Sequence, residues 1–449
     1  MNAIILAAGK GARMRSDKPK VLQVLSGKTL LEYVIDSAHK LCAKMYVVYG
    51  FGGEKVQQTI KSDWINWVEQ AEQLGTGHAV MQALGQIEDG VICLILYGDV
   101  PLITQKSLQK LIAEAQKNSA ALLTIDLENP TGYGRIVRQN GQIKSIVEEQ
   151  DASDEQRAIC EVNTGIMAFD SSLLRRYLKA LDNDTAQGEF YLTDIIAIAV
   201  ADGKEVASVV AEDEMEVAGV NDKEQLAGLE RALQKKQAKQ FMQDGLTLKD
   251  PSRFDCRGNF SFGKDCICDI NVLIEGVVSL GNNTLIAPNC ILKNAKIGNN
   301  VVILANTIID GATIDSGATI GPFARIRPET DIGANAKIGN FVEVKKSIVG
   351  ANSKISHLSY VGDTVMGKGV NIGAGVITCN YDGANKHQTN IEDGAFVGSG
   401  SQLIAPVVVG KNATIGAGST ISKNAPAEQL TLSRSKQTSL KNWNKPSKK

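Results

Sequence analysis

A six-residue repeat in the second half of the chain constrains the fold more than any other feature. Apolar residues recur at every sixth position over 285–309, resume one place out of phase over 314–344, and recur again over 397–421. Glycine often follows the apolar residue, as at Gly298 and Gly321. This period fits neither an α-helix nor a flat strand. It is typical of a parallel β-helix in which each hexapeptide forms one face of a triangular coil.

The repeat fails between Val344 and Val397, and this stretch is rich in polar residues. His357 and Tyr360 lie within it, and Asn380 and Lys386 belong to a polar excursion further along. A rigid coil that is interrupted by a polar loop is a suitable platform for a site, so we expect one here. The alternative is a coil that serves only as a spacer or an oligomerisation stalk.

The first half of the chain follows a different pattern. Apolar runs such as 91–98 alternate with amphipathic runs such as 104–118, which predicts an α/β domain with a largely parallel sheet. A long helix is expected after Asn221 and should stop at Gly245. Because 449 residues exceed one ordinary core, we expect separate domains. The boundaries predicted are an α/β domain at 1–223, a helical linker at 224–244 and a β-helical domain at 245–449.

The loop after the first apolar strand, AAGKGARM, has little side-chain bulk and much positive charge. Gly9 and Gly11 leave its backbone accessible, and Lys10, Arg13 and Lys20 surround it with cations. Backbone N–H groups in such a turn can bind an anion, so the loop predicts a phosphate ligand. Its spacing matches neither the Walker pattern nor the dinucleotide fingerprint, and an ordinary strand-to-helix turn remains the alternative.

Composition excludes several other classes of protein. The net charge of −1 gives no overall field toward nucleic acid or membrane, and no apolar stretch is long enough to span a bilayer. The first residues lack the order of a signal peptide, so we expect a cytoplasmic protein. The eight cysteines are scattered, and the Cys266–Cys268 pair lacks metal-ligand spacing, so reduced thiols are expected.

Several motifs, taken in order, resemble those of the bacterial bifunctional GlmU family. They are LAAGKGARM, QAEQLGTGHA, YGDVPL, GYGRI, NTG and GVND in the first half, and SHLSYVGD and CNYDG in the second. The family couples an N-acetylglucosamine-1-phosphate uridylyltransferase to a glucosamine-1-phosphate N-acetyltransferase. The resemblance therefore implies a Rossmann-like transferase domain followed by a left-handed parallel β-helix. It also implies synthesis of UDP-N-acetylglucosamine, a precursor for peptidoglycan and lipid A, from glucosamine 1-phosphate, acetyl-CoA and UTP.

For the first half, the resemblance implies a uridylyltransferase site at the carboxyl ends of the strands. The residues that would bind the nucleotide and the sugar are Leu6, Ala7, Ala8, Gly9, Lys20, Gln70, Gly75, Thr76, Tyr97, Gly98, Asp99, Gly134, Glu148, Asn163 and Asn221. Arg13 and Lys20 would neutralise the phosphates during catalysis, and Asp99 and Asn221 would hold Mg²⁺. Ala12 stands where the family often has Thr, and Glu148 could instead be a solvated surface residue.

For the second half, the resemblance implies His357 as the general base that deprotonates the attacking amine. Glucosamine 1-phosphate would be bound by Arg327, Lys345, Tyr360, Asn371 and Lys386, and acetyl-CoA by Ala374, Asn380, Tyr381, Ser399, Ala417 and Arg434. The chain would form a homotrimer whose acetyltransferase site is shared between subunits, since these residues are spread along the sequence. His39 and His78 are expected to be structural, and the role of His387 stays open.

Two other functions stay open from the sequence alone. One is a sugar-1-phosphate nucleotidyltransferase whose hexapeptide coil is only regulatory or oligomerising. The SHLSY and CNYDG segments argue against it, because a spacer needs neither. The other is a non-catalytic scaffold, in which the pattern of Arg13, Asp99 and Asn221 would be accidental.

Overall fold

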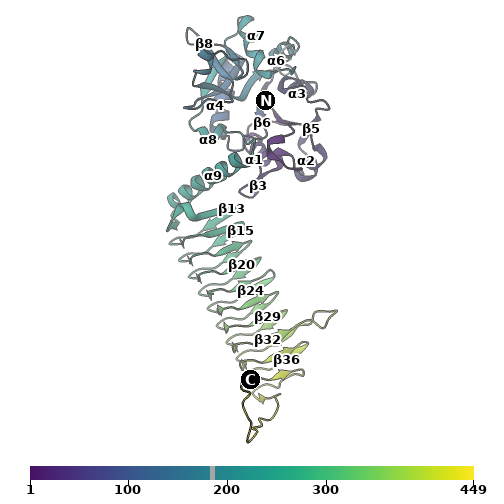
Figure 1. Cartoon of the computed structure of the whole chain (residues 1–449), viewed down its shortest axis with the longest axis vertical. Helices are drawn as coiled ribbons and strands as arrows, with labels where there is room; N and C mark the ends of the chain where they lie inside the picture. The colour runs from purple at the N-terminus through teal and green to yellow at the C-terminus, as the bar shows by residue number, and fades with distance from the viewer. Residues whose placement is uncertain (183–187, 449) are drawn as a thin grey trace. The chain divides into compact units, whose positions relative to one another are not determined.

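The computed structural model describes residues 1–182 and 188–448, and the chain divides into two compact units (Figure 1). They are Met1–Leu233 and Gln234–Lys449, so the division falls inside helix α9, Lys223–Gln243. Leu229 and Leu233 of this helix belong to a core cluster of the first unit, and Ala238 belongs to the core of the second. Of the helices described, none is both long enough and apolar enough to cross a membrane.

The first unit is built on a sheet with strand order β11-β7-β10-β6-β1-β4-β5, to which β8 and β9 are joined through β10. The strands are β1 Asn2–Ala7, β4 Lys44–Tyr49, β5 Ile65–Glu69, β6 Ile92–Tyr97, β7 Ala120–Asp126, β8 Arg135–Gln139, β9 Gln142–Val147, β10 Glu161–Asp170 and β11 Ala207–Val210. A separate small hairpin pairs β2 Val24–Leu25 with β3 Lys28–Thr29. The main sheet is largely parallel as expected, but β10 runs antiparallel to both β6 and β7.

Helices cover both faces of this sheet. They are α1 Leu30–His39, α2 Gly53–Thr59, α3 Thr76–Leu84, α4 Gln105–Asn118, α5 Asp154–Arg157, α6 Ser171–Leu178, α7 Ile195–Ala201 and α8 Glu214–Val217. All six residues of β1 are buried, because alternate side chains enter different cores. Ile5 packs in a cluster with residues of α1 and α4, whereas Ile4 packs with residues of α3, α6 and α7.

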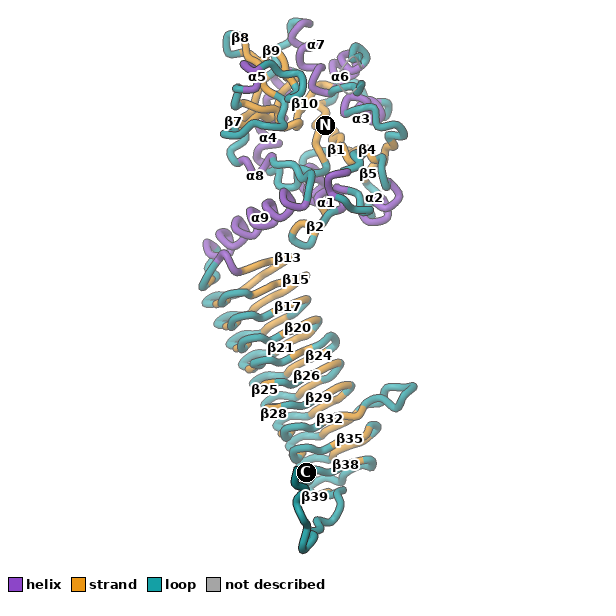
Figure 2. Tube along the Cα trace, in the orientation of Figure 1, coloured by secondary structure: helices purple, strands orange, loops and turns teal. Residues whose placement is uncertain are grey.

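The second unit is a coil of short parallel strands, as the hexapeptide repeat predicted (Figure 2). One sheet contains β12 Thr247–Leu248, β14 Ile267–Cys268, β16 Leu285–Ile286, β19 Val302–Ile303, β22 Thr319–Ile320, β25 Lys337–Asn340, β28 Lys354–His357, β31 Asn371–Ile372, β34 Phe396–Val397, β37 Thr414–Ile415 and β39 Leu430–Thr431. Each rung pairs with the next at a spacing of 17 residues (Leu285 with Val302) or 18 residues (Thr319 with Lys337).

The remaining strands of the coil belong to a 17-stranded sheet that supplies its other two faces. They are β13 Phe254–Phe262, β15 Val272–Leu280, β17 Ile291–Lys293, β18 Lys296–Ile297, β20 Ile308–Asp310, β21 Ala312–Ile314, β23 Arg325–Ile326, β24 Thr330–Ile332, β26 Glu343–Lys345, β27 Ile348–Val349, β29 Tyr360–Gly362, β30 Thr364–Met366, β32 Ile377–Cys379, β33 Thr389–Ile391, β35 Gln402–Ile404, β36 Val407–Val409 and β38 Thr420–Ile421. Side chains that point inward from all three faces fill one continuous core.

The inward phase differs from the sequence expectation at the start of the repeat. Ile286 and Leu292 are fully buried, whereas Leu285 is 36% exposed and Ile291 is half-buried. The expectation was wrong here because both members of each pair are apolar, so the repeat alone does not say which one points inward.

The expected failure of the repeat was also wrong. Val349, Ile355, Val361, Met366 and Ile372 keep the core filled through the whole stretch. A five-residue step at some corners shifts the phase without breaking the coil. The main excursion in this stretch is the loop at 380–388, between β32 and β33, which projects from the coil in Figure 2.

Asparagine residues at the corners make the sharp turns of the coil possible. Asn283 and Asn300 both have left-handed φ, of 54° and 56°, a conformation that Asn tolerates better than most residues. Asn283 Nδ2 donates to Asn300 Oδ1 at 3.1 Å, so the turns of adjacent rungs are also joined by side chains.

The corrected phase leads to a stability prediction. Replacing Leu292 by Ala should lower the free energy of unfolding of the second unit by about 2–5 kcal/mol, because it opens a cavity in the core. Replacing the outward-pointing Leu285 by Ala should cost less than about 1 kcal/mol. Urea unfolding of the two variants measures the difference. Equal destabilisation would contradict the assigned phase.

Candidate functional sites

The first unit contains a cavity of about 470 Å³ at the carboxyl ends of β1 and β6. Most of the residues expected to contact a nucleotide line it. They are Leu6, Ala7, Ala8, Gly9, Lys20, Gln70, Gly75, Thr76, Tyr97 and Asp99. A second cavity of about 620 Å³ shares Thr76 and Tyr97 with the first, so the two adjoin. It is lined by the expected residues Arg13, Gly134, Glu148 and Asn163.

The glycine loop after β1 offers open backbone to the first cavity. A Cβ on Gly9 would meet nothing within 4 Å, so a ligand can approach the chain there. Gly11 has φ 62° and leads into a single 3₁₀ turn, η1 Ala12–Met14, rather than an α-helix. An anion at this loop would therefore be met by turn backbone and by the flanking cations, not by a helix N-terminus.

Gly75 and Gln70 shape the opposite wall of the first cavity. Gly75 has φ 103°, and a Cβ there would lie 2.7 Å from the Phe190 carbonyl oxygen, so only glycine fits. Gln70 is buried, and its Nε2 donates to the Gly75 carbonyl at 3.1 Å. The same Nε2 lies 3.2 Å from His78 Nδ1, so His78 supports this wall.

Lys20 already holds the two oxygen ligands that were expected to bind Mg²⁺. Lys20, at the start of η2 Lys20–Leu22, forms an ion pair with Asp99 and donates to Asn221 Oδ1 at 3.1 Å. The side chains of Lys20 and Asp99 are only 15% and 13% exposed. Carboxylate and amide oxygens that hold an ammonium group in this way also suit a hard divalent cation.

No third protein ligand accompanies this pair. Among residues 1–182 and 188–448 there is no group of three His, Cys, Asp or Glu side chains with metal-binding geometry. The residues present fit an ion that takes its remaining ligands from water and substrate phosphates, as Mg²⁺ commonly does.

Glu148 lies in the second cavity rather than on a solvated face. Burial raises the pKa of its carboxyl group, while a hydrogen bond from Thr193 Oγ1 at 2.9 Å acts in the opposite direction. Glu148 can therefore accept hydrogen bonds from a neutral polar ligand such as a sugar hydroxyl.

Some residues of the first unit lie elsewhere than expected or were not expected at all. Gly98 and Asn221 line neither cavity, and Gly98 instead donates from its N–H to the Leu6 carbonyl at 2.9 Å. The cavities also include Gln73, Gly165, Glu189, Tyr191 and Thr193, which carry no motif that the sequence could reveal. His39 packs against Trp64, with ring centroids 4.0 Å apart.

In the second unit, the rungs align five residues in one column. Asn340, His357, Ala374, Ser399 and Ala417 each stand two positions past an inward residue of the 11-stranded sheet. Direct backbone bonds join the later rungs, since Gly400 N donates to the Ala374 carbonyl at 2.7 Å and Gly418 N to the Ser399 carbonyl at 2.8 Å. We call these five residues the His357 column.

One end of the His357 column is open and one end holds a cation. Ala374, Ser399 and Ala417 have small side chains, so an extended ligand can approach them closely. Arg434 Nη1 donates to the Ala417 carbonyl at 2.9 Å, which places a guanidinium group beside the last of them. These four were all expected to contact acetyl-CoA, and the structure brings them together. Asn371 begins the rung that leads to Ala374.

A second group of expected residues lies at the other end of the next face. Arg327 and Lys345 occupy equivalent positions on consecutive rungs, and Arg327 Nη1 contacts Glu343 Oε1 at 2.7 Å. Contact with the like-charged Lys345 ammonium lowers the pKa of Lys386. Two adjacent ammonium groups favour binding of an anion between them. We call Arg327, Lys345, Tyr360 and Lys386 the cationic corner.

The loop at 380–388 carries Lys386 and has its own internal bonds. Asn380 donates to Asp363, and an isolated bridge pairs Tyr381 with Lys386. Asp382 accepts from Asn385 N at 2.7 Å and from His387 Nε2 at 2.6 Å, and these bonds lower the pKa of its carboxyl group. His387 therefore helps to close the loop. The Tyr381 side chain is 59% exposed.

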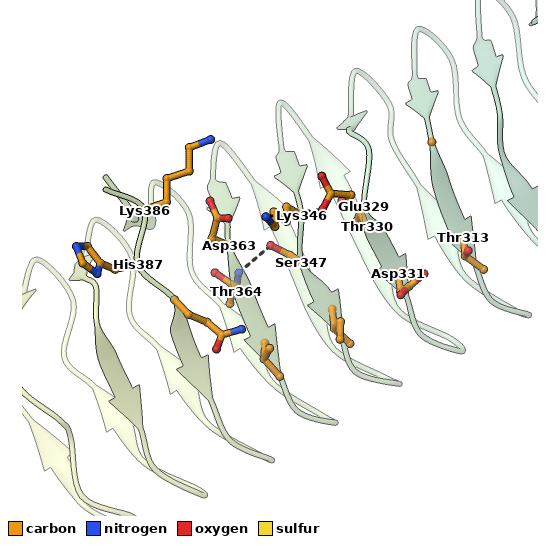
Figure 3. Close-up of a pocket in the computed structure, with 14 residues that line it drawn as sticks. Thr313, Glu329, Thr330, Asp331, Lys346, Ser347, Asp363, Thr364, Lys386 and His387 are labelled. Atoms are coloured by element: carbon orange, nitrogen blue, oxygen red, sulfur yellow. Dashed lines mark hydrogen bonds and ion pairs between the residues drawn. The ribbon is translucent and has the colours of Figure 1, made fainter. Parts of the chain in front are cut away.

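Figure 3 shows a further cavity, of about 530 Å³, beside this loop. Lys386 is the one expected residue that lines it. The wall otherwise mixes both signs of charge, with Lys346 Nζ 3.7 Å from Glu329 Oε2. The cavity therefore does not coincide with the expected acetyltransferase site.

Comparison with known protein families matches both units. Residues 3–139 match the MobA-like NTP transferase domain, residues 308–381 match the GMPPB C-terminal domain, and residues 388–423 match the bacterial transferase hexapeptide (six repeats). The two transferase matches fall in different units of the structure.

Curated relatives match along the whole chain, and each is named bifunctional protein GlmU. The protein of Ruthia magnifica subsp. Calyptogena magnifica is 64% identical over 100% of this chain and 99% of its own length. That of Vesicomyosocius okutanii subsp. Calyptogena okutanii is 61% identical over 98% of both chains. That of Marinobacter nauticus is 51% identical over 100% of this chain and 99% of its own.

One solved structure, a UDP-glucose pyrophosphorylase complexed with UDP-glucose, is a weaker match. It aligns with 52% of this chain and 98% of its own, at a TM-score of 0.45 and 17% identity.

The position of Lys20 leads to a prediction about metal binding. Removing its ammonium group in Lys20→Met should strengthen Mn²⁺ binding without nucleotide by roughly 5-fold or more, because the cation that competes for Asp99 is gone. Electron paramagnetic resonance of free Mn²⁺ measures this, and Lys10→Met is the matched control. Mn²⁺ binding to Lys20→Met that is no tighter than to the unmodified protein would contradict the competition.

Proposed function

This chain belongs to the bifunctional GlmU family, and we infer from that membership that it catalyses two steps of UDP-N-acetylglucosamine synthesis. It transfers an acetyl group from acetyl-CoA to glucosamine 1-phosphate, and it transfers a uridylyl group from UTP to N-acetylglucosamine 1-phosphate. The observation that carries this conclusion is identity of 51–64% along essentially the whole chain, with a transferase match in each unit. A coil that is only regulatory does not agree with it.

We assign uridylyl transfer to the two adjoining cavities of the first unit. A phosphate oxygen of N-acetylglucosamine 1-phosphate attacks the α-phosphorus of UTP, and the bond to pyrophosphate breaks. The nucleophile is already an anion, so positioning and charge neutralisation replace a strong base. Lys20 would leave Asp99 to contact the phosphates, and Arg13 would approach them from the second cavity.

The metal and sugar positions follow from the same cavities. Asp99 and Asn221 would hold Mg²⁺, which when bound neutralises phosphate charge. Support comes from their shared contact with the Lys20 ammonium. Glu148 would accept hydrogen bonds from the sugar, with Gly134 and Asn163 lining the same cavity.

We assign acetyl transfer to the second unit, with His357 as the general base. The amine of glucosamine 1-phosphate attacks the thioester carbonyl, the new amide bond forms, and the carbon–sulfur bond of acetyl-CoA breaks. His357 takes the proton that the amine loses. The open part of the His357 column would hold the pantetheine arm, and the cationic corner would bind the sugar phosphate.

The column changes the argument for a shared site. The sequence suggested that His357, Ser399, Ala417 and Arg434 need different subunits, but one chain aligns them all. The separation that remains is between the column and the cationic corner. Lys345 pairs with Gly362, five residues beyond His357, which is a path of roughly 10–15 Å.

We therefore propose a homotrimer in which the column of one subunit meets the cationic corner of a neighbour. Exposed apolar side chains on the coil support an interface, among them Phe341, Ile348 and Leu358, which are 55%, 51% and 62% exposed. We also propose a cytoplasmic location, where UTP and acetyl-CoA are available. The eight cysteines, all free in the structure, agree with a reducing compartment.

Separate substitutions should separate the two activities. Asp99→Asn should lower uridylyl transfer by about 10²-fold or more and leave acetyl transfer unchanged, because Asp99 belongs to the first site. His357→Gln should do the reverse, with a loss of about 10²–10⁴-fold in acetyl transfer. Pyrophosphate release and thiol release measure the two steps. Loss of both activities in either folded variant would contradict two independent sites.

Mixed oligomers test whether the acetyltransferase site is shared. Co-expressed His357→Gln and Lys345→Ala chains should regain part of the acetyl transfer that each variant lacks alone. Mixed interfaces would pair the intact His357 of one chain with the intact Lys345 of another. Failure of any mixture to exceed the homogeneous variants, or an active monomer in analytical ultracentrifugation, would exclude the shared site.

A further inference from the structure

Two strands of the coil are lengthened where His357 stands. β25 Lys337–Asn340 and β28 Lys354–His357 each have four residues, whereas the neighbouring β22 and β31 have two. The lengthened ladder makes Asn340 and His357 direct register partners. Gly339 permits this pairing, since a Cβ there would overlap the Ser356 carbonyl oxygen.

The backbone on both sides of His357 is held in place. Leu358 N donates to the Asn340 carbonyl at 3.1 Å, and Ser359 Oγ donates to the His357 carbonyl at 2.8 Å. The ring therefore extends from a fixed point, and its orientation depends on what its nitrogens contact. His357 Nδ1 lies 2.8 Å from Asn340 Oδ1.

This contact selects one state of the imidazole. A side-chain amide oxygen only accepts hydrogen bonds, so Nδ1 must carry the proton and the lone pair must lie on Nε2. Over the described part of the chain, no hydrogen bond is formed by Nε2, which is therefore able to accept a proton from a substrate.

We propose that Asn340 is a positioning residue for acetyl transfer, which fixes the tautomer and the ring orientation of His357. The inference rests on the proposed role of His357 as the general base. It adds a residue that no sequence motif indicated. Asn340 blocks one side of His357 in the column, and on the other side stands Ala374, whose small side chain leaves room for substrate.

An amide suits this role better than a carboxylate would. It accepts the Nδ1 hydrogen bond without adding charge, whereas a carboxylate would favour the imidazolium form, which cannot act as a base. The charged groups on the same two strands, Lys337 and Lys354, stand at the opposite end of each strand and are unchanged in every variant below. The next rung presents the neutral Asn371.

The test compares Asn340→Ala, which removes the acceptor, with Asn340→Asp, which keeps it and adds charge. Asn390→Ala is the matched control, because Asn390 is a half-buried asparagine on β33 of the other sheet. Kinetics of acetyl transfer are measured from about pH 5.5 to 9.5 on the full chain. Uridylyl transfer, assigned to the first unit, checks that each variant is folded.

Three results are expected. Asn340→Ala should lose about tenfold or more in kcat across the pH range, with KM for both substrates changed by less than about twofold. Asn340→Asp should approach the unmodified kcat at alkaline pH, with the rising limb of its pH profile moved upward by about one unit. Asn390→Ala should behave like the unmodified protein. Unchanged kcat in Asn340→Ala, or an unmoved limb in Asn340→Asp, would overturn the proposal.

Nitrogen NMR of histidine-labelled protein gives a readout that does not depend on turnover. The chain has four histidines, and the spectrum of His357→Gln identifies the signal of His357. That signal should show the Nδ1–H tautomer in the unmodified protein and should lose it in Asn340→Ala. The same tautomer in both would overturn the proposal. If His357→Gln itself keeps acetyl transfer, the proposed base is wrong, which is a different failure.

Discussion

The parallel hydrogen-bonded ladder of the coil is the constraint on which the second site depends. Each rung pairs with the next at a spacing of 17 or 18 residues, so side chains at equivalent positions stack along one line. The ladder thereby converts distant sequence positions such as His357 and Ala417 into one column. Because the apolar side chains fix the inward phase, a slip of one residue would turn the column residues toward a different face.

The first site depends on a different interaction, the contact of Lys20 with Asp99 and Asn221. Parallel strands bring Asp99 to the edge of the sheet beside the glycine loop, and a partly buried carboxylate there needs a positive partner. Lys20 supplies it until a metal and the substrate phosphates arrive. One charged side chain can thus stabilise the free protein and then serve the bound nucleotide.

Sequence patterns predicted what repeats or what belongs to a motif, and they missed what depends on tertiary partners. The period of six predicted the coil, and the loop motifs predicted most of the residues that line the two cavities. The phase at Leu285 was wrong because Leu285 and Ile286 are both apolar and only packing decides between them. Asn340 and Thr193 were missed because their roles depend on partners that lie 17 and 45 positions away along the chain.

A crystal structure with glucosamine 1-phosphate and CoA bound tests the central claim most directly, since that claim is that the ladder builds the acetyltransferase site. The account predicts the pantetheine arm along Ala374, Ser399 and Ala417, with the sugar amine within hydrogen-bond distance of His357 Nε2. It also predicts that the sugar phosphate contacts the cationic corner of a neighbouring subunit. Binding of CoA in the cavity beside the 380–388 loop, away from His357, would contradict it.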